Sequence, residues 1–262
     1  MSRLARFRIP AAAVVLVAAM APTTFAAGMT ALAAADGAVV ARPPATPSSI
    51  VIGFVGGFVR HDNPHQKSVQ LARNIQHTVP KDTYVQVFEN RHRKTAYRTI
   101  IRQLDRNHDG LLTADEKTRA RIILFGHSWG ASAVVLLARE LDRAGIPVLL
   151  TVQVDSVAKF WQSDGVIPEN VAAAVNFYQP YGLIHGRSQI KAADPSKTQI
   201  LGNYRFDYKN TPVKCETASW FDHLTPNHAR SQCDPRLWTQ VEELVRQRME
   251  PEPANVAALP QQ

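Results

Sequence analysis

The chain lacks the features that define several common protein classes. No apolar run reaches the ~20 residues that a helix needs to cross a bilayer. The basic residues behind the formal charge of +8 are scattered, and no nucleic-acid-binding motif accompanies them. We therefore expect no stable membrane anchor and no binding of nucleic acid. The hydrophobic residues that are present, 45% of 262, suffice for the core of a folded domain.

The N-terminus has basic and apolar residues in a characteristic order. Three arginines within the first eight positions precede the apolar run AAAVVLVAAM, and small residues follow around Ala27. This order is typical of a secretory signal peptide over residues 1–27 and indicates a secreted or periplasmic protein. Cysteine is scarce, with Cys215 and Cys233 alone in the sequence. In an exported chain such a pair most simply forms a disulfide.

Two further segments have the composition of flexible chain rather than of a folded domain. Residues 28–47 are rich in alanine and proline and read as a flexible lead-in, and residues 250–262 read as a disordered tail. A single folded domain is therefore expected over residues 48–249.

Short apolar stretches alternate with amphipathic ones along this domain. The apolar stretches predict strands at 48–59, 83–90, 121–126 and 148–154, and less regular candidates at 175–179 and 199–208. The amphipathic stretches predict helices at 64–80, 94–104, 131–145 and 234–249, the last with Asp234 as N-cap and Pro235 at its first position. Strands that are apolar on both sides and alternate with helices predict an α/β fold, with a mainly parallel sheet covered by helices on both faces.

The pentapeptide Gly126-His127-Ser128-Trp129-Gly130 stands between a predicted strand and a predicted helix. A sharp turn in this context strains the backbone at the serine, and the flanking glycines remove Cβ atoms that would collide. The hydroxyl then projects at a helix N-terminus, where N–H groups favour developing negative charge. The pattern predicts that Ser128 is a catalytic nucleophile, while His127 lines the pocket or packs beside it.

The same pentapeptide and its context resemble the α/β-hydrolase family over most of the predicted domain. The resemblance implies that the N–H of Trp129, which follows the nucleophile, is one oxyanion donor. It places the second donor on the loop after an earlier strand, where a double glycine precedes Phe58. The expected second donor is therefore the N–H of Phe58 or of Gly57.

The family order of a catalytic triad is serine, acid, histidine. Asp155 directly follows the predicted strand at 148–154, at the same sheet edge as Ser128, and is the expected acid. Glu89 and Asp207 also follow strands and are weaker alternatives. The family more often takes its acid from the next strand, here 175–179, but no carboxylate follows that stretch closely.

The catalytic histidine is expected on a loop before the last helix. His228 and His223 both meet this condition, whereas His185 lies earlier in the chain. Some secreted family members resemble this chain in a loop histidine shortly before a helix that starts with Asp-Pro-Arg, which favours His228 over His223. Cys215 and Cys233 bracket both histidines, so their disulfide would fix the loop that carries the imidazole.

Upstream of the serine turn, residues 105–116 match the pattern D-x-[DN]-x-[DN]-G-x5-E and resemble an EF-hand calcium loop. The expected ligands are the side chains of Asp105, Asn107, Asp109 and Glu116 and the carbonyl oxygen of Leu111. The exiting helix is short, and no second loop is present for pairing. The strand at 121–126 separates this loop from Ser128, so Ca²⁺ would be structural and would lie roughly 20 Å or more from the chemistry.

These features together predict a secreted serine hydrolase that cleaves a carboxylic ester, with a small-molecule or lipid ester as substrate and a structural Ca²⁺. The alternatives are a non-enzymatic calcium-binding protein on a hydrolase scaffold and an amidase or peptidase with the same triad. The aromatic residues between 159 and 196 are expected to shape the specificity of the site.

Overall fold

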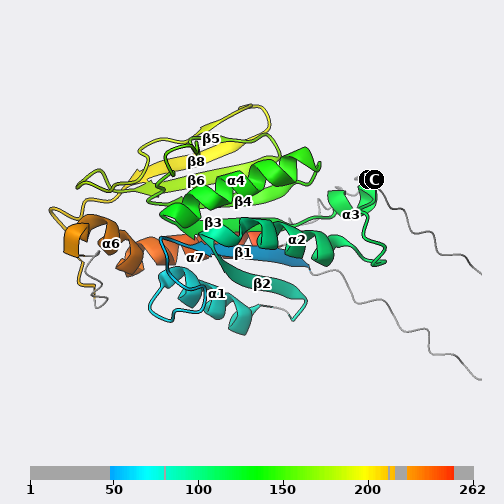
Figure 1. The fold of residues 1–262 in the computed structure, drawn as a ribbon, viewed down its shortest axis with the longest axis horizontal. Coiled ribbons are helices and arrows are strands. Elements are labelled where there is room, and N and C mark those ends of the chain that lie inside the picture. Colours follow the sequence, from blue (N-terminus) through cyan, green and yellow to red (C-terminus); the bar gives the residue numbers. More distant parts are fainter. Residues whose placement is uncertain (1–47, 80, 212, 216–222, 251–262) are drawn as a thin grey trace, which may run out of the picture. The chain divides into compact units, whose positions relative to one another are not determined.

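The computed structural model describes residues 48–79, 81–211, 213–215 and 223–250. Six strands form one sheet in which all neighbouring strands are parallel (Figure 1). From one edge to the other the strands are β2 (Thr83–Glu89), β1 (Ser49–Val55), β3 (Ile122–His127), β4 (Val148–Val154), β6 (Val171–Tyr178) and β8 (Gln199–Arg205). Ser128, after β3, therefore lies near the middle of the sheet at its carboxyl edge.

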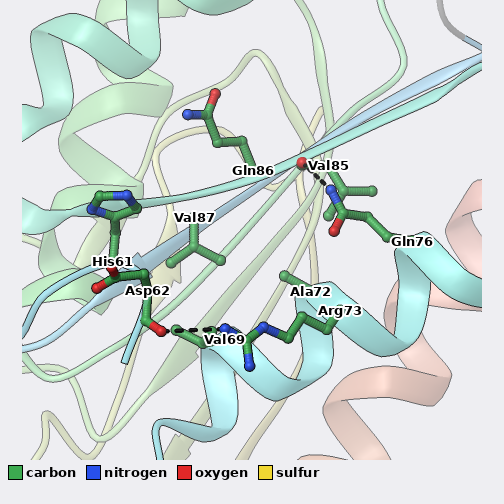
Figure 2. Close-up of a pocket in the computed structure, with 9 residues that line it drawn as sticks. All are labelled: His61, Asp62, Val69, Ala72, Arg73, Gln76, Val85, Gln86 and Val87. Carbon is green, nitrogen blue, oxygen red and sulfur yellow. Dashed lines mark hydrogen bonds between the residues drawn. The ribbon is translucent and has the colours of Figure 1, made fainter. Parts of the chain in front are cut away.

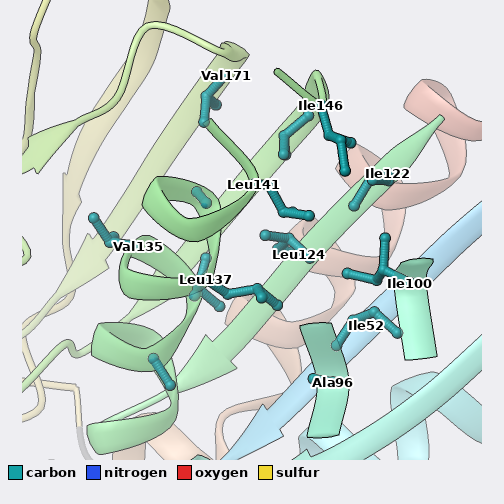
Figure 3. Close-up of a cluster of buried hydrophobic side chains, with 14 of the residues drawn as sticks. Ile52, Ala96, Ile100, Ile122, Leu124, Val135, Leu137, Leu141, Ile146 and Val171 are labelled. Carbon is teal, nitrogen blue, oxygen red and sulfur yellow. The ribbon is translucent and has the colours of Figure 1, made fainter. Parts of the chain in front are cut away.

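The apolar runs of the sequence become strands that are buried on both faces. Side chains of a strand point alternately to opposite faces. On β1, Ile50, Ile52 and Phe54 belong to one buried apolar cluster, and Val51 and Val55 belong to the other. Figure 3 shows part of the first cluster, with Ile52 among side chains from neighbouring elements.

Four long helices cover the two faces of the sheet. Side chains of α2 (Arg93–Leu104) and α4 (Trp129–Arg143) pack in the first cluster, and those of α1 (Lys67–Thr78) and α7 (Pro235–Met249) pack in the second. The prediction of a parallel sheet with helices on both faces is thereby confirmed. With a sharp strand–serine–helix turn at the end of β3, the fold is α/β-hydrolase-like.

The last long helix begins as its sequence predicts. The side chain of Asp234 caps α7 by accepting a hydrogen bond from the backbone N–H of Arg236, at 2.9 Å. Pro235 occupies the first turn, where its missing N–H costs nothing. The helix therefore starts at a fixed position directly after the segment that carries the candidate catalytic histidine.

Shorter elements lie at the two ends of the strands. These are η1 (Asn90–His92), α3 (Ala114–Thr118), α6 (Pro226–Cys233) and a separate pair of parallel strands, β5 (Val166–Ile167) and β7 (Lys191–Ala192). Figure 1 shows α6 beyond one end of the strands and α3 beyond the other. The calcium-like loop leads into α3, and α6 carries the candidate catalytic histidine and ends at Cys233. The two predicted sites therefore belong to opposite ends of the fold.

Cys215 and Cys233 form the predicted disulfide. The predicted signal peptide and lead-in, and the tail from residue 251 onward, lie outside the described residues, as does the stretch 216–222 between the two cysteines. Among the helices that the structure describes, none combines the length and the hydropathy needed to cross a membrane.

Candidate active site

Ser128 forms the turn between β3 and α4. Its φ of 56° and ψ of −126° lie in a region that costs a residue other than glycine about 1–3 kcal/mol. The backbone N–H of Ser128 donates to the carbonyl oxygen of Val154 at 2.9 Å, which ties the turn to the end of β4. A strained serine held in this way presents its hydroxyl at the first turn of a helix, as a nucleophile requires.

The two glycines of the pentapeptide permit backbone contacts that a side chain would prevent. A Cβ atom on Gly126 would lie 2.5 Å from the carbonyl oxygen of Gly130. A Cβ atom on Gly130 would collide with the carbonyl oxygen of Phe54 in β1. The sharp turn at Ser128 is therefore possible only because both positions lack a side chain.

The structure brings together the three residues that the sequence pointed to as a triad. The Nε2 atom of His228 lies 2.9 Å from the Oγ atom of Ser128, and its Nδ1 atom lies 2.7 Å from an Oδ2 atom of Asp155. The exposed fractions of Ser128, His228 and Asp155 are 7%, 6% and 0%. This chain of contacts lets the imidazole receive the serine proton while the carboxylate orients the ring.

Asp155 is held in place by several donors besides His228. Its Oδ1 atom accepts from the backbone N–H groups of Gln179 and Gly186, at 3.1 and 2.6 Å, and its Oδ2 atom accepts from the side-chain amide of Gln179 at 3.0 Å. The residue itself has a φ of 44°. Gln179 directly follows β6, the strand after which no carboxylate stands closely. Its side chain instead fixes the carboxylate of Asp155, which follows the neighbouring strand β4.

His228 lies on a helix, which corrects the expectation of a loop. It is the third residue of α6, whose first residue is Pro226. The segment from 226 to 233 has no apolar stripe, so periodicity gave no sign of a helix. His223 is exposed at the start of the described stretch before α6. The contacts with Ser128 and Asp155 belong to His228.

His127 and Ser231 form a second layer behind the triad. The His127 ring stacks on the His228 ring, with centroids 4.8 Å apart. Its Nε2 atom lies 2.9 Å from Ser231 Oγ, which lies 2.7 Å from the carbonyl oxygen of His228 and 3.4 Å from Asp155. Burial, and next the neighbouring His228, hold the pKa of His127 well below its ordinary range. A neutral His127 that donates from Nε2 to Ser231 Oγ fits these hydrogen bonds, because the Ser231 hydroxyl then donates to the carbonyl oxygen of His228.

The expected oxyanion donors lie on two segments beside Ser128. The N–H of Trp129, at the first position of α4, has no intrahelical partner. The loop after β1 turns at Gly57, whose φ is 47°, and the N–H of Val59 donates to the carbonyl oxygen of Gly56 at 3.2 Å. A Cβ atom on Gly56 would lie 2.9 Å from that of Ser128, so this loop lies directly against the nucleophile.

The alternative acids and the third histidine take other roles. Glu89, at the end of β2, forms an ion pair with Arg91, and its carboxylate lies 3.4 Å from the Nδ1 atom of His92. The Oδ1 atom of Asp207 accepts from the backbone N–H groups of two following residues, at 3.0 and 3.1 Å, which is a turn contact. His185 is exposed, and its ring lies 3.4 Å from the carbonyl oxygen of Gly186.

Among the described residues, His127, Asp155 and His228 form the group whose candidate metal-ligand atoms lie within 4.8 Å of one another. Both nitrogens of His228 and the Nε2 atom of His127 already have hydrogen-bond partners in Asp155, Ser128 and Ser231. The group therefore suits proton transfer better than metal binding.

The calcium-like loop has the turn geometry of its motif. The backbone N–H groups of Gly110 and Leu111 donate to the side chains of Asp105 and Asp109, at 3.0 and 2.8 Å. Gly110 has a φ of 81°. Glu116 accepts from the backbone N–H groups of Thr113 and Arg106, which lower the pKa of its carboxyl group. This loop precedes β3 and Ser128 follows it, as the sequence predicts.

The aromatic residues between 159 and 196 divide into surface and core. Phe160 and Trp161, in the loop after β4, are 101% and 81% exposed, whereas Phe177 on β6 is buried in the second cluster. Phe58, on the loop beside Ser128, is also exposed, and its ring lies 5.3 Å from that of Trp129. The exposed aromatics thus follow strand ends at the same sheet edge as Ser128.

A shallow pocket lies elsewhere, between α1 and the edge strand β2 (Figure 2). The side-chain amide of Gln76 donates to the carbonyl oxygen of Val85 at 3.0 Å, and Arg73 donates to the carbonyl oxygen of Asp62 at 3.3 Å. None of the triad residues lines it. Its polar groups are engaged with the protein, so the pocket offers no chemistry comparable to that at Ser128.

No protein-family model and no curated protein matches the chain. Several solved structures are partly similar to the chain. A thermostable esterase from Pseudomonas putida is 10% identical, with 79% of this chain and 76% of that chain covered and a TM-score of 0.41. An acetylxylan esterase is 9% identical, with coverages of 79% and 100% and a TM-score of 0.39. A cutinase-like protein from Cryptococcus sp. is 12% identical, with coverages of 80% and 98% and a TM-score of 0.37. Likenesses this distant carry no information about the chemistry of the chain.

Several residues of this site could not be found in the sequence. Gln179 and Ser231 carry no motif, and neither does Asn90, whose Nδ2 atom donates to the carbonyl oxygen of Gly57 on the loop beside Ser128. All three meet the site only through tertiary contacts. The one available signal was position, since Asn90 and Gln179 are the last residues of predicted strands and directly follow β2 and β6 in the structure.

Proposed function

We propose that this chain is an exported serine hydrolase that cleaves carboxylic esters. The observation that carries the proposal is the buried chain of contacts from Ser128 through His228 to Asp155, at 2.9 and 2.7 Å. The strained backbone at Ser128 adds support, because such strain is kept where a side chain must be aimed.

The geometry suggests a conventional two-step acyl transfer. Ser128 Oγ attacks the ester carbonyl while His228 Nε2 takes its proton. The same nitrogen returns the proton to the departing alcohol, leaving an acyl group on Ser128. Water, deprotonated by His228 Nε2, then attacks the acyl carbonyl, and the same nitrogen returns the proton to Ser128 Oγ as the acid leaves. Asp155 keeps the imidazole in the tautomer that has its free lone pair on Nε2.

An ester is the proposed substrate, and the exposed aromatics near the site, Phe58, Phe160 and Trp161, favour one with an apolar acyl or alcohol part. Lipid esters and small acyl esters both have this chemistry. The N-terminal sequence and the Cys215–Cys233 disulfide support a secreted or periplasmic location.

The test is labelling with a fluorophosphonate probe, combined with p-nitrophenyl esters of increasing chain length and matching anilides. Wild type should be labelled at Ser128, and Ser128→Ala should not. Turnover of anilides at rates comparable to esters would instead support the amidase or peptidase alternative. Lack of both labelling and turnover would leave the non-enzymatic calcium-binding alternative.

We further propose that residues 105–116 bind a structural Ca²⁺. The supporting observation is Asp105, which is 7% exposed and has an Oδ1 atom without a hydrogen-bond partner. A buried carboxylate oxygen in this state is costly unless a cation or water approaches it. Glu116 Oε1 accepts one hydrogen bond, from Arg106 N–H at 2.7 Å, and retains a lone pair for a cation. With Asn107, Asp109 and the carbonyl oxygen of Leu111, these atoms are the hard oxygen ligands that Ca²⁺ prefers.

A further inference from the structure

Asn90 fixes the loop that lies against Ser128. It is the first residue of η1, directly after β2, and is 6% exposed. Its Nδ2 atom lies 2.6 Å from the carbonyl oxygen of Gly57 and 3.4 Å from that of Val55. One buried amide therefore holds both the end of β1 and the turn that follows it.

This contact determines the direction of the next N–H group. In a trans peptide, the carbonyl and the N–H point to opposite sides. Because Asn90 holds the carbonyl of Gly57, the N–H of Phe58 points away from Asn90. Within the turn, the N–H of Val59 is the group that donates to Gly56, so the turn leaves the Phe58 N–H available. Phe58 thus has the better placed N–H of the two that the sequence left open.

Lys159 fixes the orientation of the Asn90 amide. Its Nζ atom donates to Asn90 Oδ1 at 3.1 Å. An ammonium group has no acceptor, so the amide must turn its oxygen toward Lys159 and its NH₂ group toward the two carbonyls. The same Nζ atom lies 5.0 Å from the centroid of the Trp129 ring. The centroids of the Trp129 and Phe58 rings are 5.3 Å apart. Lys159 and Asn90 therefore join the two backbone segments beside Ser128.

We propose that Asn90 and Lys159 are positioning residues that hold the N–H groups of Phe58 and Trp129 at the distance an oxyanion needs. The inference rests on the proposed ester hydrolysis and adds the specific N–H of Phe58 as second donor. Loss of a single oxyanion donor typically lowers kcat by about 10²–10³, and a misplacement of about 1 Å costs about 10². Neither residue touches the reacting atoms, so the effect should appear in kcat rather than in KM.

The test uses Asn90→Asp, Asn90→Ala, Lys159→Met and Lys159→Arg in the full chain. Asn90→Asp preserves size and the acceptor for Lys159 but replaces the donor to Gly57. The matched control is Asn170→Ala. The Nδ2 atom of Asn170 also bonds two backbone carbonyls, those of Ala138 and Ile146, at 3.1 and 2.8 Å, but at the opposite edge of the sheet.

The measurements are kcat and KM on a p-nitrophenyl ester, the inhibition constant of a trifluoromethyl ketone that forms a tetrahedral adduct, and the melting temperature. Both Asn90 variants should lower kcat about 30- to 100-fold, with KM within about threefold, and should weaken the ketone by the same factor as kcat. Lys159→Met should lower kcat about tenfold, and Lys159→Arg should restore most of it. Asn170→Ala should lower only the melting temperature.

Two outcomes overturn the proposal while wild type is active and labelled by fluorophosphonate. One is an Asn90→Asp variant with kcat no lower than that of Asn170→Ala. The other is a fall in kcat without weaker binding of the ketone. If wild type itself is neither active nor labelled, the proposed function fails and this inference fails with it, whatever the variants show.

Discussion

The imidazole of His127 stacks on that of His228, with ring centroids 4.8 Å apart and ring planes 30° apart. Two imidazolium ions could not share this buried space without strong repulsion. Burial and the nearby His228 keep the pKa of His127 well below its ordinary range, so it stays neutral at pH 7. The proton from Ser128 is therefore taken up by His228 alone. His127 stays neutral and contacts Ser231 Oγ, which donates to the carbonyl oxygen of His228.

This pairing predicts how stability depends on pH. In the unfolded chain His127 binds a proton below its ordinary pKa of 6.5, whereas the folded chain leaves it neutral to a much lower pH. As pH falls below 6.5, this group should favour unfolding by up to about 1.4 kcal/mol per pH unit. His127→Gln keeps a donor for Ser231 and cannot titrate. Denaturant unfolding between about pH 7 and pH 5 gives the slope of the unfolding free energy against pH. This slope should be smaller in His127→Gln than in wild type, by about one proton. An unchanged slope would contradict the assignment.

The proposed nucleophile and base should behave as one unit. Ser128→Ala and His228→Ala should each lower kcat/KM by about 10⁴-fold or more, and the double variant should lose little beyond that. The exposed His223 provides the control, because His223→Ala should retain near-normal kcat/KM. The kcat/KM values are measured by ester kinetics on variants that remain folded. An inactive His223→Ala beside an active His228→Ala would reverse the assignment.

The identity of the acid can be tested with isosteric amides. Asp155→Asn cannot accept from both His228 and Gln179 in the way a carboxylate does, and kcat should fall by about 10⁴-fold. Asp207→Asn and Glu89→Gln alter the two other strand-end carboxylates and should leave kcat within a few-fold. Circular dichroism would show whether the variants remain folded. A larger loss in Glu89→Gln than in Asp155→Asn would rule out Asp155 as the acid.

Calcium should stabilise the fold and leave the chemistry almost unchanged. A ligand that binds only the folded state adds about 2.7 kcal/mol at a hundredfold excess over Kd. Asp105→Ala and Glu116→Ala should abolish the rise in melting temperature that Ca²⁺ produces. Asp115→Asn, within the loop but outside its ligand pattern, should preserve it. Melting curves with and without chelator measure this shift. An immediate, reversible loss of kcat on chelation, with the fold intact, would place the metal at the active site.

The disulfide should matter for activity as well as for stability. Cys233 is the last residue of α6, and the bond to Cys215 closes a sequence separation of 18. Loop-closure arithmetic gives about 3 kcal/mol for a bridge of this size. The paired variant Cys215→Ser/Cys233→Ser should unfold at correspondingly lower denaturant. Below its melting point its kcat should fall more than its KM rises, because α6 positions His228. Full activity would show that α6 is held without the bridge.

Much of the fold and three residues of the site were accessible from the sequence because their signals are local. Apolar runs such as 148–154 indicate strands, and the glycines around Ser128 indicate a sharp turn. Asp155 was reached from its place at a strand end. The same local reasoning missed the helix around His228, whose short polar sequence has no stripe.

The missing parts of the site depend on contacts between distant residues. Asn90 and Lys159 are 69 positions apart, and Ser231 lies 104 positions from His127. Nothing in the neighbouring sequence distinguishes these side chains from ordinary surface or core residues. Such pairs emerge only when the sheet brings the ends of separate strands to one edge.

The covalent bond at the end of α6 gives the proposed enzyme a dependence on compartment. A chain still in a reducing cytoplasm has Ser128, Asp155 and His228 but not the bridge that holds the helix of His228. Oxidation after the proposed export would then complete the site. Disulfide formation would in this way act as a maturation step of the proposed enzyme.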